Sequence, residues 1–148
     1  MPPTLLLSCE SLGKRYGIKA LFSDLSLTLN EGDRVGLIGP NGSGKSTLLK
    51  ILAGMEEADE GSRSLRRHVR IGYVAQEPSF PEGHTVEETL ASALGAEGHD
   101  PHEQGDRIAR AVGLGRFARA DQPIAELSGG WKKRLAIARA LLIEPDVL

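Results

Sequence analysis

The sequence predicts an α/β fold in which strands and a glycine-rich loop come first and helices follow. Leu25, Leu27 and Leu29 alternate with polar residues, which is typical of a half-buried strand. The apolar run at residues 35–38 has the pattern of a buried strand, and helix-forming leucines recur soon after it in residues 46–53. The chain has 148 residues, which suits one ordinary domain or a piece of a larger one.

Composition excludes several classes of protein. Lys and Arg number 18 against 20 Asp and Glu, and the net charge of −2 argues against a generally basic coat for nucleic acid. The one cysteine, Cys9, excludes an internal disulfide framework and a cysteine-based zinc site, and we expect it to be a small buried or half-buried residue. Residues 1–4 lack the features of a signal peptide, and no apolar run could span a bilayer. We therefore expect a cytoplasmic protein.

Turn and helix signals divide the first half of the chain. Residues 30–33 predict a turn, and Gly54 is a good stop for the helix at 46–53. Residues 56–61 are acidic and loop-like. Apolar residues then alternate with polar ones at 69–73, which predicts another strand.

The second half has the signals of helices. Thr85 and Glu88 form a capping box, so a helix is expected to begin there. Pro145 ends the last apolar-periodic stretch. Helices are expected over residues 85–94, 103–112 and 128–143, with a loop at 95–101.

The last residues predict a chain that is a piece of a longer domain. Residues 145–148 have the pattern of a new apolar strand that is cut after two apolar residues. We expect a nucleotide-binding α/β part at 1–78, a helical subdomain at 79–130, and a last helix with the start of a truncated strand at 131–148.

A glycine-rich loop carries the strongest motif, G-x-x-x-x-G-K-[ST], at residues 39–46. Glycines let successive backbone N–H groups turn toward phosphate oxygens, and the helix that follows presents its positive dipole end to the same anion. A lysine adds a positive charge near the β and γ phosphates, and a serine hydroxyl suits Mg²⁺. The nucleotide-binding candidates here are Gly39, Asn41, Gly42, Ser43, Gly44, Lys45, Ser46 and Thr47.

Glycine patterns in the chain also allow other interpretations. The loop could be a glycine turn with a solvated lysine, although its place between a strand and a helix favours phosphate binding. It is not a dinucleotide-binding fingerprint, because Thr47 stands where a third small glycine is needed. A looser pattern at residues 113–118 follows a helix and is disfavoured.

With three further motifs, this loop resembles the ATPase domain of the ABC (ATP-binding cassette) family over nearly the whole chain. Leu127-Ser128-Gly129-Gly130 is similar to the family signature, Gln76 to the glutamine of the glutamine loop, and Tyr16 to the aromatic that stacks on adenine. Alone, Ser128-Gly129-Gly130 could be an ordinary helix cap, Gln76 a polar residue at a strand end, and Tyr16 a turn or core aromatic. Together they imply a P-loop NTPase core, here incomplete, with a helical subdomain that carries the signature.

The resemblance implies ATP and Mg²⁺ as cofactors. Lys45 and Gln76 would be catalytic, Ser46 and Gln76 would hold Mg²⁺, and Ser128, Gly129 and Gly130 would contact the ATP of a facing domain. The aspartate, glutamate and histidine that complete the family's machinery would lie after Leu148. We therefore expect the parent to be an ATPase, and this chain to bind nucleotide without hydrolysing it well. Exposed sheet edges predict self-association.

The subclass depends on the residue after the signature. Trp131 stands where the family commonly has glutamine, and basic residues follow at 132–134, which resembles the ABC-F subclass. That subclass is soluble, has two ATPase domains in one chain, and includes members that act on ribosomes. The long charged arm that many members carry is missing between Gln76 and Ser128. The ATP-binding subunit of a membrane transporter remains the alternative.

Two weaker candidates lie outside these motifs. A basic cluster could contact RNA or a ribosome, although a solvated strand entrance explains it as well; it consists of Arg63, Arg66, Arg67, His68 and Arg70. His99 and His102 could bind a metal, but no further ligand is nearby in the sequence.

Overall fold

The computed structural model describes residues 3–95 and 101–148, and it divides into two compact units. The first unit runs up to Ile71 and includes Val147. The second, called the helical unit, comprises residues 72–146 and Leu148. Among the described residues, no helix has both the length and the hydropathy needed to cross a bilayer.

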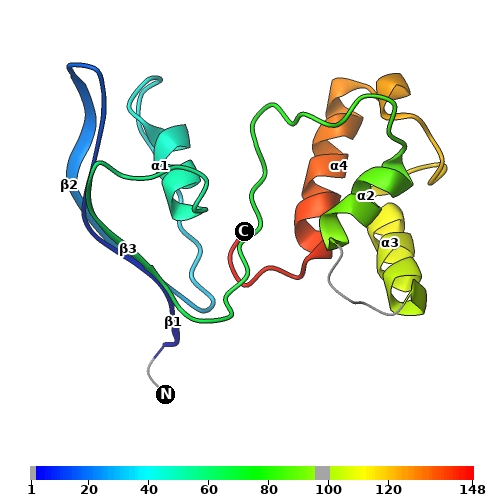
Figure 1. The fold of residues 1–148 in the computed structure, drawn as a ribbon, viewed down its shortest axis with the longest axis horizontal. Helices are drawn as coiled ribbons and strands as arrows, with labels where there is room; N and C mark the ends of the chain where they lie inside the picture. Colours follow the sequence, from blue (N-terminus) through cyan, green and yellow to red (C-terminus); the bar gives the residue numbers. More distant parts are fainter. Residues whose placement is uncertain (1–2, 96–100) are drawn as a thin grey trace. The chain divides into compact units, whose positions relative to one another are not determined.

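The first unit contains an antiparallel sheet (Figure 1). Its strands are β1 (Leu5–Tyr16), β2 (Lys19–Asn30) and β3 (Glu60–Leu65), in the order β2-β1-β3. β1 and β2 form a hairpin in which Tyr16 pairs with Lys19. β3 returns to the other edge of β1, where Leu65 pairs with Leu7. The alternation predicted at Leu25, Leu27 and Leu29 is therefore confirmed as part of β2.

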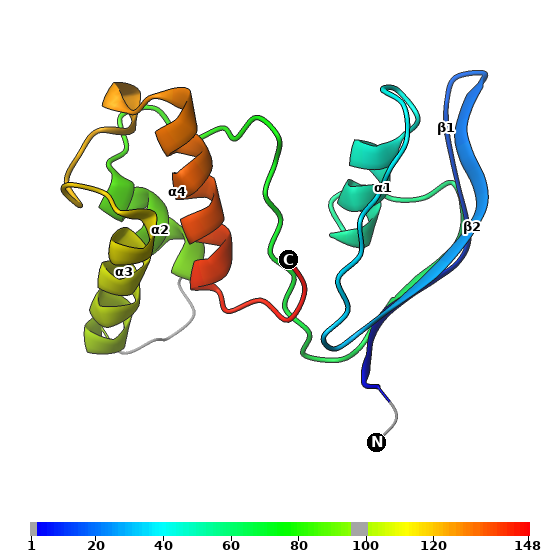
Figure 2. The ribbon, with the colours of Figure 1, turned by 180° about the vertical axis from the view of Figure 1, so that it is seen from behind.

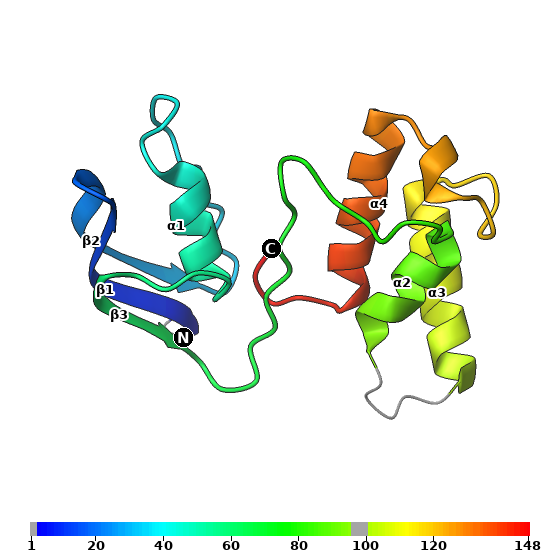
Figure 3. The ribbon, with the colours of Figure 1, turned by 45° about the horizontal axis from the view of Figure 1, so that its top comes forward.

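Helix α1 (Lys45–Leu52) covers one face of this sheet (Figure 3). Three buried side chains of β1 meet two from α1 in one core cluster, which consists of Leu7, Cys9, Leu12, Leu48 and Ile51. Burying each such side chain stabilises the unit by roughly 1.5–3 kcal/mol, so this cluster is the main link between helix and sheet. Cys9 is 2% exposed, as predicted, and burial raises the pKa of its thiol while the charge of Arg63 lowers it.

The helical unit is built around α4 (Gly129–Leu142), which packs against both α2 (Val86–Leu94) and α3 (Pro101–Gly115), as Figure 2 shows from behind. A short 3-10 helix, Ile124–Glu126, precedes α4. The buried core is aliphatic apart from Phe117, and its fully buried residues include Val86, Leu90 and Leu135. The predicted helices at 85–94, 103–112 and 128–143 are thus confirmed, with α3 longer than expected.

Two predicted strands are wrong in this structure. Residues 35–38 form no strand, and the side chains of Val35 and Ile38 are 71% and 96% exposed. The stretch at 69–73 is reduced to one parallel bridge between Ile71 and Val147. A buried parallel strand needs hydrogen-bonded neighbours. Within the described residues this bridge is the one parallel pairing, so an apolar run alone does not become a strand.

The metal candidate at His99 and His102 stays a prediction. His99 lies outside the described residues, and the side chain of His102 does too. In the part of the chain that is described, no group of three His, Cys, Asp or Glu side chains could hold a metal ion.

The capping box at the start of α2 is formed as predicted. The N–H of Thr85 donates to Glu88 Oε2 at 2.8 Å, and the N–H of Glu88 donates to Thr85 Oγ1 at 3.2 Å. The backbone and hydroxyl hydrogen bonds from Thr85 hold the pKa of Glu88 below its usual range.

Removing the cap tests its contribution to the helical unit. Thr85→Ala leaves the Glu88 N–H without its side-chain acceptor, so we expect the free energy of unfolding to fall by about 1 kcal/mol. Urea unfolding followed by circular dichroism measures the change. Thr85→Ser keeps the hydroxyl and serves as the control, and an equal loss in both variants would contradict the role of the cap.

Candidate functional site

The glycine-rich segment at residues 39–47, called the phosphate loop from here on, includes the first turn of α1. Gly42 has φ +80° and Gly44 has φ +91°, in the left-handed region that favours glycine. At Gly39, an added Cβ would lie 3.0 Å from Ser43 Oγ. The loop is therefore wound so tightly that side chains at these positions would strain or crowd it. This is the local geometry that the motif predicts.

Lys45 folds back over the phosphate loop. Its ammonium group donates to the carbonyl oxygens of Gly39 and Pro40, each at 2.7 Å. An ammonium group has three donors, so a third can reach an oxygen of a ligand held by the loop. The lysine thus places a positive charge at the loop itself and not out in solvent.

The N-terminus of α1 is suited to an anion. The helix starts after Gly44 without a side-chain cap, and its first turn contains no acidic residue. The unpaired N–H groups and the helix dipole make this end positive. Ser46 and Thr47 lie in this first turn, and the Ser46 side chain is exposed, so its hydroxyl is accessible to a divalent cation.

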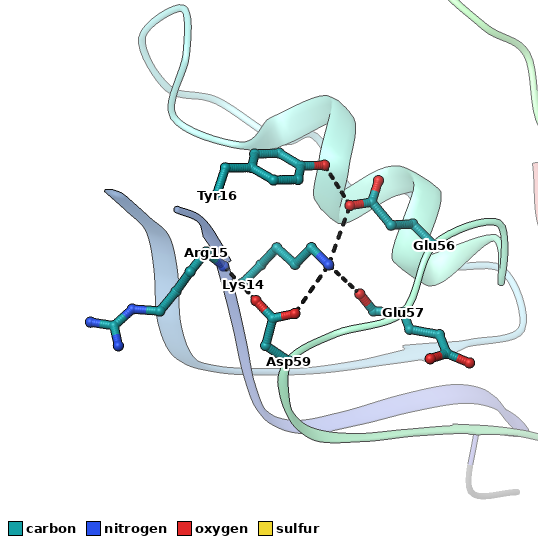
Figure 4. Close-up of polar contacts among 6 residues, drawn as sticks. All are labelled: Lys14, Arg15, Tyr16, Glu56, Glu57 and Asp59. Carbon is teal, nitrogen blue, oxygen red and sulfur yellow. Dashed lines mark hydrogen bonds and ion pairs between the residues drawn. The ribbon is translucent and has the colours of Figure 1, made fainter. Parts of the chain in front are cut away.

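Tyr16 lies in the same unit, at the end of β1. It is 54% exposed, so its ring is accessible for stacking. Its hydroxyl donates to Glu56 Oε1, and the Lys14 ammonium is 5.7 Å from its ring centroid (Figure 4). Sequence reasoning did not find Lys14 and Glu56, because no local pattern links them to Tyr16.

The β1–β2 hairpin contains Tyr16 and also lies against Gly44 of the phosphate loop. Tyr16 pairs with Lys19, and two residues further along the hairpin, Leu21 and Phe22 contact Gly44. A Cβ added to Gly44 would lie 3.0 Å from Leu21 Cβ and 3.1 Å from the Phe22 ring. Within the first unit, the same hairpin therefore contains the predicted aromatic and lies against the predicted phosphate loop.

Charges around Tyr16 shift three pKa values. The hydrogen bond from Tyr16 lowers the pKa of Glu56 against the opposing effect of desolvation, and Lys14 lowers it further. The backbone N–H of Arg15 lowers the pKa of Asp59, and Lys14 adds to the effect. Desolvation lowers the pKa of Lys14, but hydrogen bonds and charges from Asp59 and Glu56 outweigh it and raise the value.

The signature residues begin α4 in the helical unit. Ser128 is the N-cap residue, although its side chain makes no capping hydrogen bond. Gly129 and Gly130 are exposed, and a Cβ added to either would meet nothing within 4 Å. Packing within the described part of the chain therefore does not explain these glycines. A ligand or partner that approaches the backbone closely would explain them.

Trp131 and Gln76 also belong to the helical unit. Trp131 is half-buried, with its ring 5.6 Å from that of Phe117 and the Arg134 guanidinium 4.8 Å from its centroid. It therefore has a packing role. Gln76 is exposed in a bend at residues 76–77.

The basic cluster is partly structural. Arg63 Nε donates to the carbonyl oxygen of Leu52 at 2.8 Å, at the C-terminus of α1. This end of the helix is negative, so a guanidinium group stabilises it. Arg66, Arg67 and His68 are exposed, as a solvated strand entrance would be.

Comparison with known proteins identifies the family. Residues 22–148 match the family described as ABC transporter. This chain therefore belongs to the ABC transporter family, as the four motifs predicted.

Individual relatives agree with this assignment. The chain is 36% identical to the uncharacterized ABC transporter ATP-binding protein YfmR of Bacillus subtilis, over 97% of this chain and 28% of that protein. It is 38% identical to the Nod factor export ATP-binding protein I of Ralstonia nicotianae, over 98% of this chain and 49% of that protein. The chain thus spans half or less of the length of these two curated relatives.

Solved structures share the fold. One described as the structure of the ATP binding subunit of an ABC transporter is 29% identical, with a TM-score of 0.84 over 95% of this chain and 63% of that one. The ATP-binding cassette MJ0796 bound to ADP and Pi is 24% identical, with a TM-score of 0.82 over 95% of this chain and 71% of that one. At that identity, the second likeness concerns the fold alone.

Proposed function

We propose that this chain is an ATP-binding domain of an ABC transporter ATPase. One observation carries the proposal: the Lys45 ammonium lies 2.7 Å from two carbonyl oxygens of the phosphate loop, directly before an uncapped helix N-terminus. The oxygens of a triphosphate would accept hydrogen bonds from backbone N–H groups there, and the positive charge of Lys45 would attract them. The adenine would stack on the exposed ring of Tyr16.

Each of the two residues that the motifs assign to Mg²⁺ is taken within its own unit. In the first unit, the Ser46 hydroxyl is an exposed oxygen donor of the kind that Mg²⁺ prefers. In the helical unit, Gln76 is exposed and has an amide oxygen of the same kind. When bound, the ion would neutralise charge on the β and γ phosphates. Binding of the nucleotide and its ion is what we propose for these residues.

A second ATPase domain is the proposed partner. Gly129 and Gly130 are open to the outside at the start of α4, and another helix N-terminus is formed there. These features support a site at which Ser128 and the two glycines contact the γ-phosphate of ATP held by a facing domain.

A transporter role is favoured over the ABC-F interpretation. Several relatives are named as import or export ATP-binding proteins, such as the Nod factor export protein and the sulfate/thiosulfate import protein CysA of Vibrio cholerae. Membrane transporter subunits are therefore proposed partners, with this domain at the cytoplasmic face of the membrane. An ABC-F protein that acts on ribosomes is the second candidate, and Trp131 favours it. However, Trp131 packs against Phe117, so a structural role accounts for this tryptophan and no ribosome contact is needed to explain it.

Calorimetric titration with Mg-ATP tests the proposed binding. We expect saturable binding by the natural chain, and Lys45→Ala is expected to weaken it roughly tenfold to a hundredfold, because a charge-assisted phosphate contact is lost. Circular dichroism of the variant checks that the fold is kept. Equal affinities of the folded variant and the natural chain would contradict the proposed site.

A further inference from the structure

A compact set of polar contacts holds the side chain of Lys14 (Figure 4). The ammonium group donates to the carbonyl oxygen of Glu57 at 2.7 Å and to Asp59 Oδ1 at 3.2 Å, and it pairs with Glu56 Oε1 at 3.5 Å. The three donors of the lysine thus have three acceptors. Its side chain is only 11% exposed, so Lys14 is fixed under the loop that follows α1.

The same contacts fix Asp59 and Glu56. Asp59 Oδ2 accepts the backbone N–H of Arg15 at 2.8 Å, which ties the loop before β3 to the end of β1. Glu56 Oε1 lies between the Lys14 ammonium and the Tyr16 hydroxyl (Figure 4). Lys14 therefore holds the Glu56 carboxylate in place, and this carboxylate accepts the hydrogen bond from the Tyr16 hydroxyl.

This arrangement restrains an aromatic ring that is otherwise open to solvent. Tyr16 is 54% exposed, yet its hydroxyl is bound to a half-buried carboxylate. A free side chain of this kind would lose rotamer freedom on binding a ligand, whereas a restrained ring is already ordered. The hydrogen bond with Glu56 therefore orders the Tyr16 side chain before any ligand binds.

We infer that Glu56, held in place by Lys14, is a positioning residue that orients Tyr16 for stacking on the base of a nucleotide. The inference rests on the proposed function, and it adds residues that none of the motifs includes. Glu56 would not itself touch the base. It acts through the Tyr16 hydroxyl, while Asp59 and the Glu57 carbonyl oxygen keep Lys14 in place.

The charge of Glu56 strengthens the restraint. Its pKa is lowered by the hydrogen bond from Tyr16 and by Lys14, so the carboxylate is ionised at neutral pH. A hydroxyl donating to an ionised carboxylate makes a stronger hydrogen bond than one between neutral groups. The ring is thus held under the conditions in which ATP is bound.

Two ligands separate base recognition from phosphate recognition. Mg-ATP uses both the ring and the phosphate loop, whereas Mg-tripolyphosphate has no base. We would titrate both into Tyr16→Phe, Glu56→Ala and the double variant, with Tyr16→Ala to measure the whole contribution of the ring. Glu31→Ala, which also removes one exposed carboxylate from the first unit, is the matched control.

We expect the variants to weaken the binding of Mg-ATP but not of tripolyphosphate, and the effects of the two single variants not to add. Tyr16→Phe and Glu56→Ala should each weaken Mg-ATP binding about threefold to tenfold, the range for one lost hydrogen bond. The double variant should be no weaker than the weaker single variant, because both remove the same contact. Tyr16→Ala should lose about tenfold or more, and tripolyphosphate binding should stay unchanged throughout.

Other results would overturn the inference. Equal losses for both ligands would show that Glu56 only supports the fold, and additive losses would show that it does not act through the hydroxyl. Glu56→Gln guards against unfolding, because its amide oxygen still accepts the hydroxyl and should restore most of the Mg-ATP affinity. A folded Glu56→Gln variant as weak as Glu56→Ala would contradict the restraint.

The proposed function and the inference fail separately. If the natural chain bound neither ligand, both would fall. If it bound both ligands, and Lys45→Ala abolished this while Glu56→Ala left Mg-ATP affinity unchanged, only the inference would fall.

Discussion

Gly61→Ala is expected to lower the free energy of unfolding of the first unit by about 3–5 kcal/mol. Gly61 lies in β3, opposite an irregularity of β1 between Glu10 and Gly13. An added Cβ would lie 2.4 Å from the carbonyl oxygens of Glu10 and Ser11, and φ at Gly61 is +83°. The clash involves backbone atoms, so it cannot be relieved by turning a side chain. β3 would have to move away from β1.

Gly32→Ala is a matched control for this prediction. Gly32 has the same φ of +83°, but an added Cβ would meet nothing within 4 Å. Alanine there is strained by its backbone alone, and we expect a loss of about 1 kcal/mol. Urea unfolding followed by circular dichroism measures both variants. Similar losses at the two positions would show that the clash opposite Glu10 is relieved at little cost.

The helices could be predicted because their signals are local. The capping box of Thr85 and Glu88, and Gly54 after α1, specify helix ends within a few residues. The structure forms the same box, and Gly54 has φ +75° just after α1. Periodic apolar residues set the faces that are buried, such as Leu48 and Ile51 in α1.

The sheet could not be predicted to the same extent. Its strand order places β3 beside β1, and this pairing joins residues that are far apart in the chain, such as Leu7 and Leu65. The acidic composition of residues 56–61 predicts a loop, yet β3 begins at Glu60. Conversely, residues 35–38 have the apolar pattern of a strand and lack the pairing that makes one. Strands depend on partners that a local pattern does not reveal.

The candidate site shows the same division. The phosphate loop could be predicted because glycines, lysine and serine occur at fixed spacing in one short segment. The contacts around Tyr16 could not, because they join the end of β1 to Glu56 and Asp59 in the loop after α1. Chain folding alone brings these residues together. The roles of Gln76 and Ser128 stay predictions that rest on the family resemblance.

Gly44→Ala is expected to damage both the fold and the nucleotide site. Gly44 has φ +91°, and an added Cβ would lie 3.0 Å from Leu21 Cβ and 3.1 Å from the Phe22 ring. Leu21 Cβ is fixed to the backbone of β2, so the loop and not the strand has to give way. Combining backbone strain with crowding, we expect a loss of about 2–4 kcal/mol in the free energy of unfolding.

The same substitution should also weaken Mg-ATP binding. Gly44 is the residue from which α1 starts, and Lys45 follows it directly, so a shift of the loop moves the first N–H groups and the lysine together. We expect a loss of more than about tenfold in affinity, which corresponds to about 1.4 kcal/mol. Titration at a temperature where the variant is folded separates this loss from unfolding, with Gly32→Ala as the strained variant outside the loop. A folded Gly44→Ala variant with natural affinity would show that the start of α1 does not position the phosphates.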